Sequence, residues 1–228
     1  MSKSLSTLLV SATSLLLAAS ASAQELTMNG GFETGDTSSW VSFPTATSTF
    51  EVVMDSNSGS FGGRVNNVDQ GASAVIKQAN IGVGMVNPGD MINISFAAKG
   101  SFGIGGVAFA EFFSELTGGG VSSAEILGGA PLALTNDWQT FTFTAIAGPD
   151  VSGGVTLQFA AITGAVSGST SELFVDDASV TLAGGGGPGM NYCMANPNST
   201  GATGSISATG SATASDNDVT LTASSLPP

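Results

Sequence analysis

The sequence predicts an all-β fold, an antiparallel β-sandwich of jelly-roll topology, and two observations carry that prediction. Apolar and polar residues alternate with a period of two in short segments roughly ten residues apart, and turn-forming residues separate these segments. No segment repeats apolar residues every three or four positions over the length of a convincing helix. Two packed sheets, each apolar on one face and rich in Thr, Ser and Asn on the other, fit this pattern.

Each predicted strand is a short alternating segment bounded by turn-forming residues. In the first half of the chain we expect strands at 26–28, 50–54, 64–68, 74–78 and 92–96. In the second half we expect strands at 106–116, 124–127, 140–144, 155–159 and 174–182. Turns rich in Gly, Pro, Asn and Asp separate them, for example Asn87-Pro88-Gly89-Asp90, Gly118-Gly119-Gly120 and Gly148-Pro149-Asp150.

The alternation also predicts which side chains face the core. Ile92, Ile94 and Phe96 are expected to point inward, and the polar residues between them toward solvent. Phe141 and Phe143 follow the same rule against the Thr residues on either side of them. These segments are therefore expected to be half-buried strands.

Composition and charge exclude several kinds of function. The chain has 228 residues with no His, and 4 Lys and Arg stand against 17 Asp and Glu, for a formal net charge of −13. The absence of imidazole excludes Ser-His and Cys-His nucleophile pairs, His-ligated zinc and His proton shuttles. The shortage of cations excludes a phosphate-tracking surface, so nucleic acid is not an expected partner.

The first 23 residues are typical of a secretory signal peptide. Lys3 gives a positive start, residues 8–19 form a short apolar run, and Ala21-Ser22-Ala23 is a cleavage site of small residues. About 12 apolar residues fall short of the roughly 20 that a membrane span needs. No other segment is apolar enough to span a membrane. We therefore expect a secreted, extracellular protein whose mature chain begins at Gln24.

The rest of the chain divides at a Gly-rich run. Residues 24–183 are long enough for one domain with its own core, and 184–190 are expected to be a flexible linker. The Ser/Thr/Gly-rich residues 191–228 are either disordered or the opening of a further β-module, since 219–222 alternate like a strand. Cys193 has no second cysteine in the chain, so it is free or pairs between chains.

Three motifs resemble a known family. Asn29-Gly30-Gly31-Phe32-Glu33-Thr34-Gly35, followed by Trp40, resembles the opening of the family 4/9 carbohydrate-binding modules, the CenC type. Asn136-Asp137-Trp138 and the closing strand at 173–180 agree with that family in order and spacing. The resemblance implies a galactose-binding-like jelly roll that attaches polysaccharide, commonly appended to glycoside hydrolases, with a structural calcium ion.

The resemblance also implies where calcium would bind, because the first and last strands of such modules are neighbours. Carried over, the carboxylate ligands are Glu33 and Asp176, and backbone carbonyls of the turn from Asn29 to Gly31 would add oxygen ligands. Asp176 is in phase with three apolar residues of the last strand, Phe174, Ala178 and Val180. Its carboxylate is therefore expected to point inward, where an ionised group needs a partner. The alternative is that the two acids cap turns without a metal.

Sugars are bound by aromatic ring faces, with amides, carboxylates and Arg holding the hydroxyls. The candidate sugar-binding residues are Trp40, Arg64, Asn66, Phe112 and Phe113. An alternative stays open for each type: Trp40 also suits core packing, and Arg64 also suits a salt bridge. Phe112 and Phe113 are consecutive, so one of them should face away from the core.

A glycosidase needs only two carboxylates and no His, so Glu111, Glu115 and Glu125 are the candidate catalytic acids. Glu111 and Glu115 would lie about 13 Å apart along a regular strand, beyond the usual separation of a catalytic pair. Pairing with Glu125 across strands stays open at this stage.

The sequence thus predicts a secreted, non-catalytic module that binds polysaccharide. A surface nearly without cations is unsuited to anionic polysaccharides and compatible with neutral ones. The alternative is an extracellular structural or adhesive β-sandwich protein without glycan binding, which the scarcity of Trp and Tyr favours.

Overall fold

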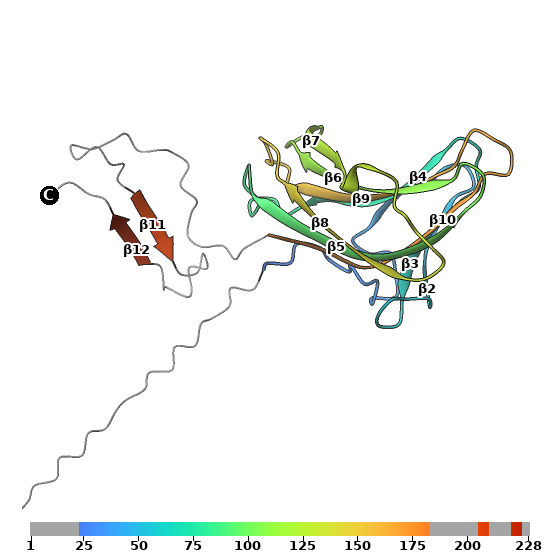
Figure 1. Ribbon diagram of the computed structural model, residues 1–228, viewed down its shortest axis with the longest axis horizontal. Coiled ribbons are helices and arrows are strands. Elements are labelled where there is room, and N and C mark those ends of the chain that lie inside the picture. Colours follow the sequence, from blue (N-terminus) through green and yellow to red (C-terminus); the bar gives the residue numbers. More distant parts are fainter. Residues whose placement is uncertain (1–22, 183–204, 210–219, 225–228) are drawn as a thin grey trace, which may run out of the picture.

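The computed structural model describes residues 23–182, 205–209 and 220–224 (Figure 1). Residues 23–182 form two five-stranded antiparallel sheets packed face to face, which confirms the predicted β-sandwich. Apart from one short 3-10 turn, η1 (Leu127–Gly129), the described residues contain no helix. Accordingly, none of the described residues belongs to a helix that could cross a membrane.

The first sheet, called here the β6 sheet, contains in spatial order β1 (Val41–Phe43), β4 (Ser73–Ile81), β9 (Val155–Ile162), β6 (Val107–Glu115) and β7 (Val121–Ile126). The second, the β5 sheet, contains β2 (Thr49–Val53), β3 (Gly62–Asn67), β10 (Ser171–Leu182), β5 (Met91–Phe102) and β8 (Gln139–Ile146). Both sheets bend in the same direction, so the outer face of the β6 sheet is concave and that of the β5 sheet is convex (Figure 1).

The core lies between the inner faces of the two sheets. Ile92, Ile94 and Phe96 of β5 are at most 1% exposed, as their alternation predicted. The ring of Phe96 meets that of Phe159 from β9 edge to face, with centroids 4.8 Å apart. Burial of each such side chain contributes roughly 1.5–3 kcal/mol, so these contacts between the sheets hold the sandwich together.

The last strand departs from the expected phase. Leu173 and Val175 are fully buried on the inner side, whereas Phe174 is half-buried on the outer face. A register shift between Asp176 and Ser179, with a positive φ of 49° at Asp177, inserts a β-bulge that reverses the alternation. Beyond the bulge Ala178 and Val180 do face the core, as expected.

The expectation that Phe174 and Asp176 share the inward side with Ala178 and Val180 is therefore wrong. Asp176 has the phase of Phe174 and lies on the outer side of the sheet. It is nevertheless fully buried, because the loop between β2 and β3 covers it.

Two further differences concern short elements. Residues 26–28 were expected to form a strand, but the structure has only an isolated bridge between Glu25 and Thr181. β1, which sequence reasoning missed, has three residues, too few to show a period.

In the C-terminal segment, β11 (Ser205–Thr209) and β12 (Thr220–Ser224) form a two-stranded sheet. The structure describes neither 1–22 nor 183–204, so all but the last residue of the predicted signal peptide, the linker and Cys193 lie outside the described residues.

Candidate functional site

The concave outer face of the β6 sheet carries aromatic and polar side chains in neighbouring rows. The register aligns Phe43 with Val75 of β4, Val75 with Ala160 of β9, and Ala160 with Phe109 of β6. This row has a ring at each end and small side chains between them. Neighbouring strands lie about 4.8 Å apart, so roughly 14 Å separates the strands that bear the two rings.

The next row along the same face is polar. It places Lys77, Gln158 and Glu111 side by side on β4, β9 and β6. The Gln158 Nε2 donates a hydrogen bond of 2.7 Å to the Glu111 Oε2, and the Lys77 Nζ lies 5.0 Å from the centroid of the Phe43 ring. None of the described carboxylates forms an ion pair with Lys77, so its donors stay free for a ligand.

Two outward-facing rings border this polar row. Phe43 is 49% exposed on the edge strand β1, and Phe113 is half-buried on β6, two residues beyond Glu111. The burial pattern of β6 places Phe109, Glu111 and Phe113 on the same outer side. The face therefore offers apolar ring surfaces beside an amide, a carboxylate and an ammonium group, which is the combination that binds a sugar ring.

The convex outer face of the β5 sheet carries Arg64 and Asn66, two of the predicted sugar-binding residues. Here Phe174 pairs with Arg64 on one side and with Lys99 on the other. The Arg64 Nε donates to the Glu172 Oε1 at 2.8 Å, and its Nη1 lies 3.1 Å from the Glu51 Oε1. Hydrogen bonding by Glu172 raises the pKa of Arg64 further above its ordinary value.

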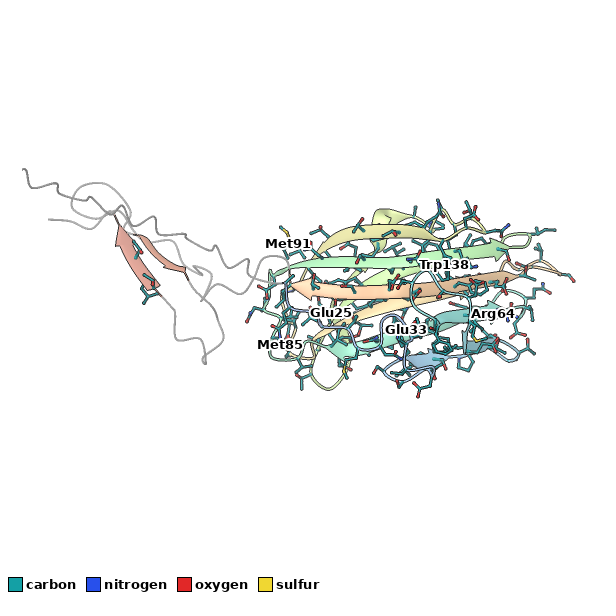
Figure 2. All side chains as sticks on the ribbon, turned by 90° about the horizontal axis from the view of Figure 1, so that it is seen from below. Glu25, Glu33, Arg64, Met85, Met91 and Trp138 are labelled. Atoms are coloured by element: carbon teal, nitrogen blue, oxygen red, sulfur yellow. The ribbon has the colours of Figure 1, made fainter. Side chains whose placement is uncertain are left out.

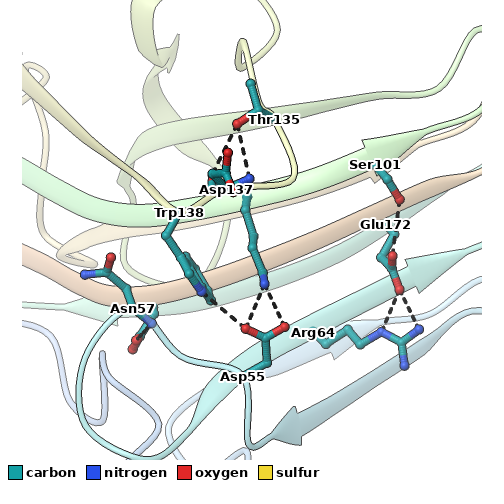
Figure 3. A network of polar contacts seen from close by, with 10 residues as sticks. Asp55, Asn57, Arg64, Ser101, Thr135, Asp137, Trp138 and Glu172 are labelled. Atoms are coloured by element: carbon teal, nitrogen blue, oxygen red, sulfur yellow. Dashed lines mark hydrogen bonds and ion pairs between the residues drawn. The ribbon is translucent and has the colours of Figure 1, made fainter.

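The rings on this face are covered by a cation. The Lys99 Nζ lies 4.9 Å from the Phe174 ring centroid and 5.1 Å from that of Trp138. The same Nζ lies 2.7 Å from the Asp55 Oδ2, and the Trp138 Nε1 donates to the Asp55 Oδ1 at 3.3 Å (Figure 3). Arg64 and Trp138 lie toward one end of the sandwich, away from Met85 and Met91 (Figure 2). Because its groups bond one another, this network is suited to holding the sheet together rather than to binding a ligand.

The Lys99–Asp55 pair makes stability depend on pH. The hydrogen bond from Lys99 holds the pKa of Asp55 below its ordinary value of 3.8. The contribution of the pair to stability is thus present above that ordinary pKa and is lost as the pH falls through the lower, folded-state pKa. We expect Lys99→Met to flatten the acid side of the curve of melting temperature against pH.

Lys77→Met is the matched control, because Lys77 has no ion pair among the described residues. Its melting temperature should fall with acid as steeply as that of the unsubstituted protein. Thermal melts between about pH 5 and pH 2 compare the three proteins. An acid slope that Lys99→Met leaves unchanged would contradict the role given to the pair.

Two other predicted sugar-binding residues lie in the core. Trp40 is 6% exposed, stacks on Phe32 with centroids 5.4 Å apart, and donates from its Nε1 to the Asn29 carbonyl at 3.0 Å. Phe112 is 2% exposed, whereas Phe113 faces outward, so the consecutive pair divides between core and surface as expected. Of the five predicted residues, Phe113 alone lies on the concave face.

Sequence reasoning missed three residues of this face, Phe43, Lys77 and Gln158. The alternation in β9 could have assigned Gln158 to the outer side, since the residues beside it are apolar. For Lys77 the signal in β4 is weaker, because the polar Gln78 follows it. No pattern in the sequence predicted the pairing of β1 with β4 that adds Phe43.

The predicted calcium ligands Glu33 and Asp176 lie near each other, on either side of Gly31. A Cβ added to Gly31 would lie 3.6 Å from the Asp176 Oδ1 and 3.8 Å from the Glu33 Cγ. Both carboxylates accept backbone hydrogen bonds from the loop between β2 and β3. The Asp176 Oδ2 accepts from the amides of Asn57 and Ser58 at 2.8 and 3.0 Å.

Three further backbone amides donate hydrogen bonds to Glu33 and Asp176. The Glu33 Oε1 accepts from the amides of Ser60 and Phe61 at 2.9 and 3.0 Å, and the Asp176 Oδ1 accepts from the amide of Asp177 at 2.7 Å. Burial raises the pKa of Asp176, against the effect of these amide donors. The negative charge of the pair is thus met by oriented N–H groups.

Asn29, the third predicted ligand, is used by its own turn. Its carbonyl accepts from the Phe32 amide and from Trp40, and its Oδ1 accepts from the Thr34 amide. Within residues 23–182 and the two C-terminal strands, no three His, Cys, Asp or Glu side chains gather into a group that could hold a metal ion. The predicted site has two carboxylates and relies on backbone carbonyls for its other ligands, so calcium binding stays a prediction.

The candidate catalytic acids do not face one another. Glu111 bonds Gln158, and the Glu115 Oε1 accepts from the Thr156 Oγ1 at 2.7 Å. Glu125 of β7 pairs with Phe112, whose side chain points into the core, so Glu125 has the opposite phase from Glu111. A regular ladder directs these two side chains to opposite faces of the sheet.

Comparison with solved structures finds the same sandwich in other proteins. The bacteriophage CBA120 tailspike protein 4 enzymatically active domain matches with a TM-score of 0.55 and 16% identity, over 70% of this chain and 21% of that chain. The CBM22-1 xylan-binding domain of Paenibacillus barcinonensis Xyn10C matches with a TM-score of 0.52 and 13% identity, over 74% of this chain and 100% of that chain.

A third match is the CBM22-1 and GH10 modules of Clostridium thermocellum endo-1,4-beta-D-xylanase 10B, complexed with xylohexaose. Its TM-score is 0.51 at 18% identity, over 71% of this chain and 29% of that chain. Jelly-roll carbohydrate-binding modules are thus among the structural neighbours, and at these identities the similarity establishes the fold. Neither a family model nor a curated relative matches the sequence, so membership of family 4/9 stays a prediction.

Proposed function

We propose that this chain is a secreted, non-catalytic module that binds a neutral polysaccharide on the concave face of the β6 sheet. The observation that carries the proposal is the row Lys77, Gln158 and Glu111, bordered by the outward rings of Phe43 and Phe113. The convex face is less suited, since its cations Arg64 and Lys99 form ion pairs with carboxylates, whereas Lys77 forms none with the described residues. Export rests on the N-terminal sequence.

The fold and the charge support the same proposal. Structural neighbours with this sandwich include modules described as xylan-binding. The chain carries few cations, which disfavours anionic polysaccharides. The separation of the candidate acids favours a binding role over glycoside hydrolysis.

Affinity electrophoresis tests the proposal, with gels that contain xylan, β-glucan or mannan. We expect at least one of these polysaccharides to retard the full chain. Phe43→Ala and Phe113→Ala should each weaken the retardation by about tenfold in affinity, because each removes a ring face worth about 1.4 kcal/mol to the sugar.

Ile104→Ala is the matched control, since it truncates an apolar side chain that is 73% exposed outside this face. Retardation should be unchanged in that variant. If no polysaccharide retards the protein, the adhesive or structural alternative is favoured instead. If Phe43→Ala and Phe113→Ala bind as well as the unsubstituted chain, the site is not on this face.

A further inference from the structure

The four edge strands of the sandwich are not equally protected against pairing with another strand. Natural sheets protect their edges with short strands, charged side chains or bulges. β1 has three residues, and β2 carries Glu51. β7 carries the exposed Glu125 and has a register shift against β6. Each of these three edges has at least one protective feature.

The fourth edge, β8, has none of these features. It runs for eight residues, Gln139–Ile146, without a charged residue, a Pro or a Gly. All eight residues pair with β5 in continuous register, so the strand is not bulged. Among the described residues, no strand pairs with its other side.

The side chains of β8 alternate between the convex face and the core. Thr140, Thr142 and Thr144 are exposed on the convex face, and Phe141 and Phe143 pack against the core. The turn η1 lies against the ring of Phe143, where a Cβ on Gly128 would be 3.1 Å away. η1 thus contacts the strand on its inner face.

The central sequence of β8, Thr140-Phe141-Thr142-Phe143-Thr144, is a palindrome. When two such strands pair antiparallel about a two-fold axis at Thr142, every Thr lies opposite a Thr and every Phe opposite a Phe. Aromatic pairs and Thr pairs across antiparallel strands are each favourable by roughly 0.2–1 kcal/mol. A two-fold axis requires such self-complementarity.

We propose that β8 is the interface of a homodimer, in which the β8 strands of two copies pair antiparallel about Thr142. Each β5 sheet then continues into its partner's, and the unpaired N–H and C=O groups of both edges are satisfied. The pairing uses neither the concave face nor its residues, so it is independent of the proposed glycan binding.

Sedimentation equilibrium of the full chain, measured over a range of protein concentrations, tests the proposal. We expect a reversible monomer–dimer equilibrium. Thr142→Lys places two like charges opposite each other on the axis and should raise the dissociation constant about tenfold or more. Thr142→Glu should do the same. An equimolar mixture of the two variants should recover the dimer, because opposite charges then face each other.

Asn93→Lys is the control, because Asn93 is exposed beside Thr144 but lies on the interior strand β5. It should leave the β8 dimer intact. A dimer held by contact between convex faces would instead be weakened by Asn93→Lys as well as by Thr142→Lys. A protein that stays monomeric at all concentrations overturns the proposal. So does a dimer that Thr142→Lys does not weaken, or mixed variants that fail to recover it while both keep their far-ultraviolet circular dichroism.

Discussion

Gly30→Ala is expected to destabilise the sandwich by roughly 3 kcal/mol, which lowers the melting temperature of a domain of this size by about 10 °C. A Cβ at this position would lie 1.9 Å from the carbonyl oxygen of Ala178 and 2.9 Å from its carbon. Both are backbone atoms of the closing strand and cannot rotate away. The turn would have to move off β10 and break the hydrogen bond of 3.0 Å from the Ala178 amide to the Gly30 carbonyl.

The same turn seats the first aromatic residues of the core. Phe32 is fully buried and stacks on Trp40, so a displacement at Gly30 propagates to both rings. Gly31→Ala is the matched control: its nearest atoms lie at 3.6 to 3.8 Å, in ordinary van der Waals contact. We expect that variant to change stability by less than about 0.5 kcal/mol. Thermal denaturation of both variants decides the matter, and equal losses would contradict the explanation.

Local pattern was sufficient to predict the sandwich but not every strand. Alternation in β5 and β8 identified their inner faces, because burial of one face imposes a period of two wherever a strand is long enough. β1 is too short for any period to show. In β10 the bulge at Asp177 reverses the alternation of inward and outward side chains. No pattern in the sequence around Asp177 specifies that bulge.

The candidate site was less accessible to sequence reasoning, because its residues meet only through tertiary register. Phe43 lies on the edge strand β1, and Phe113 lies on β6, with β4 and β9 between them. The pairings of these four strands bring both rings onto one face. The motif acids show the same limit. Asp176 accepts from the amides of Asn57 and Ser58, which are 119 and 118 residues away in the chain. The sequence could predict a carboxylate that needs a partner, but could not identify the partner.

Asp176→Asn is the second substitution expected to have a large effect, a loss of about 3 kcal/mol. The carboxylate accepts three backbone amides at a fully buried position. An asparagine has one acceptor oxygen, so its NH₂ group must face the loop amides or the amide of Asp177. Either way buried donors lose their acceptor, at a cost of roughly 1–3 kcal/mol for each group.

Asp177→Asn is the matched control next to it. Asp177 accepts from the Ser58 Oγ at 2.6 Å and from the Asn57 Nδ2 at 2.8 Å, both at exposed positions where water can replace the carboxylate. Asparagine also tolerates the positive φ of this residue. We expect a loss below about 1 kcal/mol, and urea denaturation of both variants gives the comparison. A loss in Asp177→Asn as large as that in Asp176→Asn would contradict the specific role of the buried amides.

Repeating both measurements with a calcium chelator distinguishes the two explanations of the motif acids. If amides alone hold Glu33 and Asp176, chelation leaves the unsubstituted protein unchanged, and Asp176→Asn is equally destabilised with and without chelator. If calcium binds there, chelation destabilises the unsubstituted protein, but has little effect on Asp176→Asn, which has already lost the carboxylate. The two explanations therefore differ in what chelation does to the unsubstituted protein: its stability is unchanged if amides alone hold the acids, and it falls if calcium binds there.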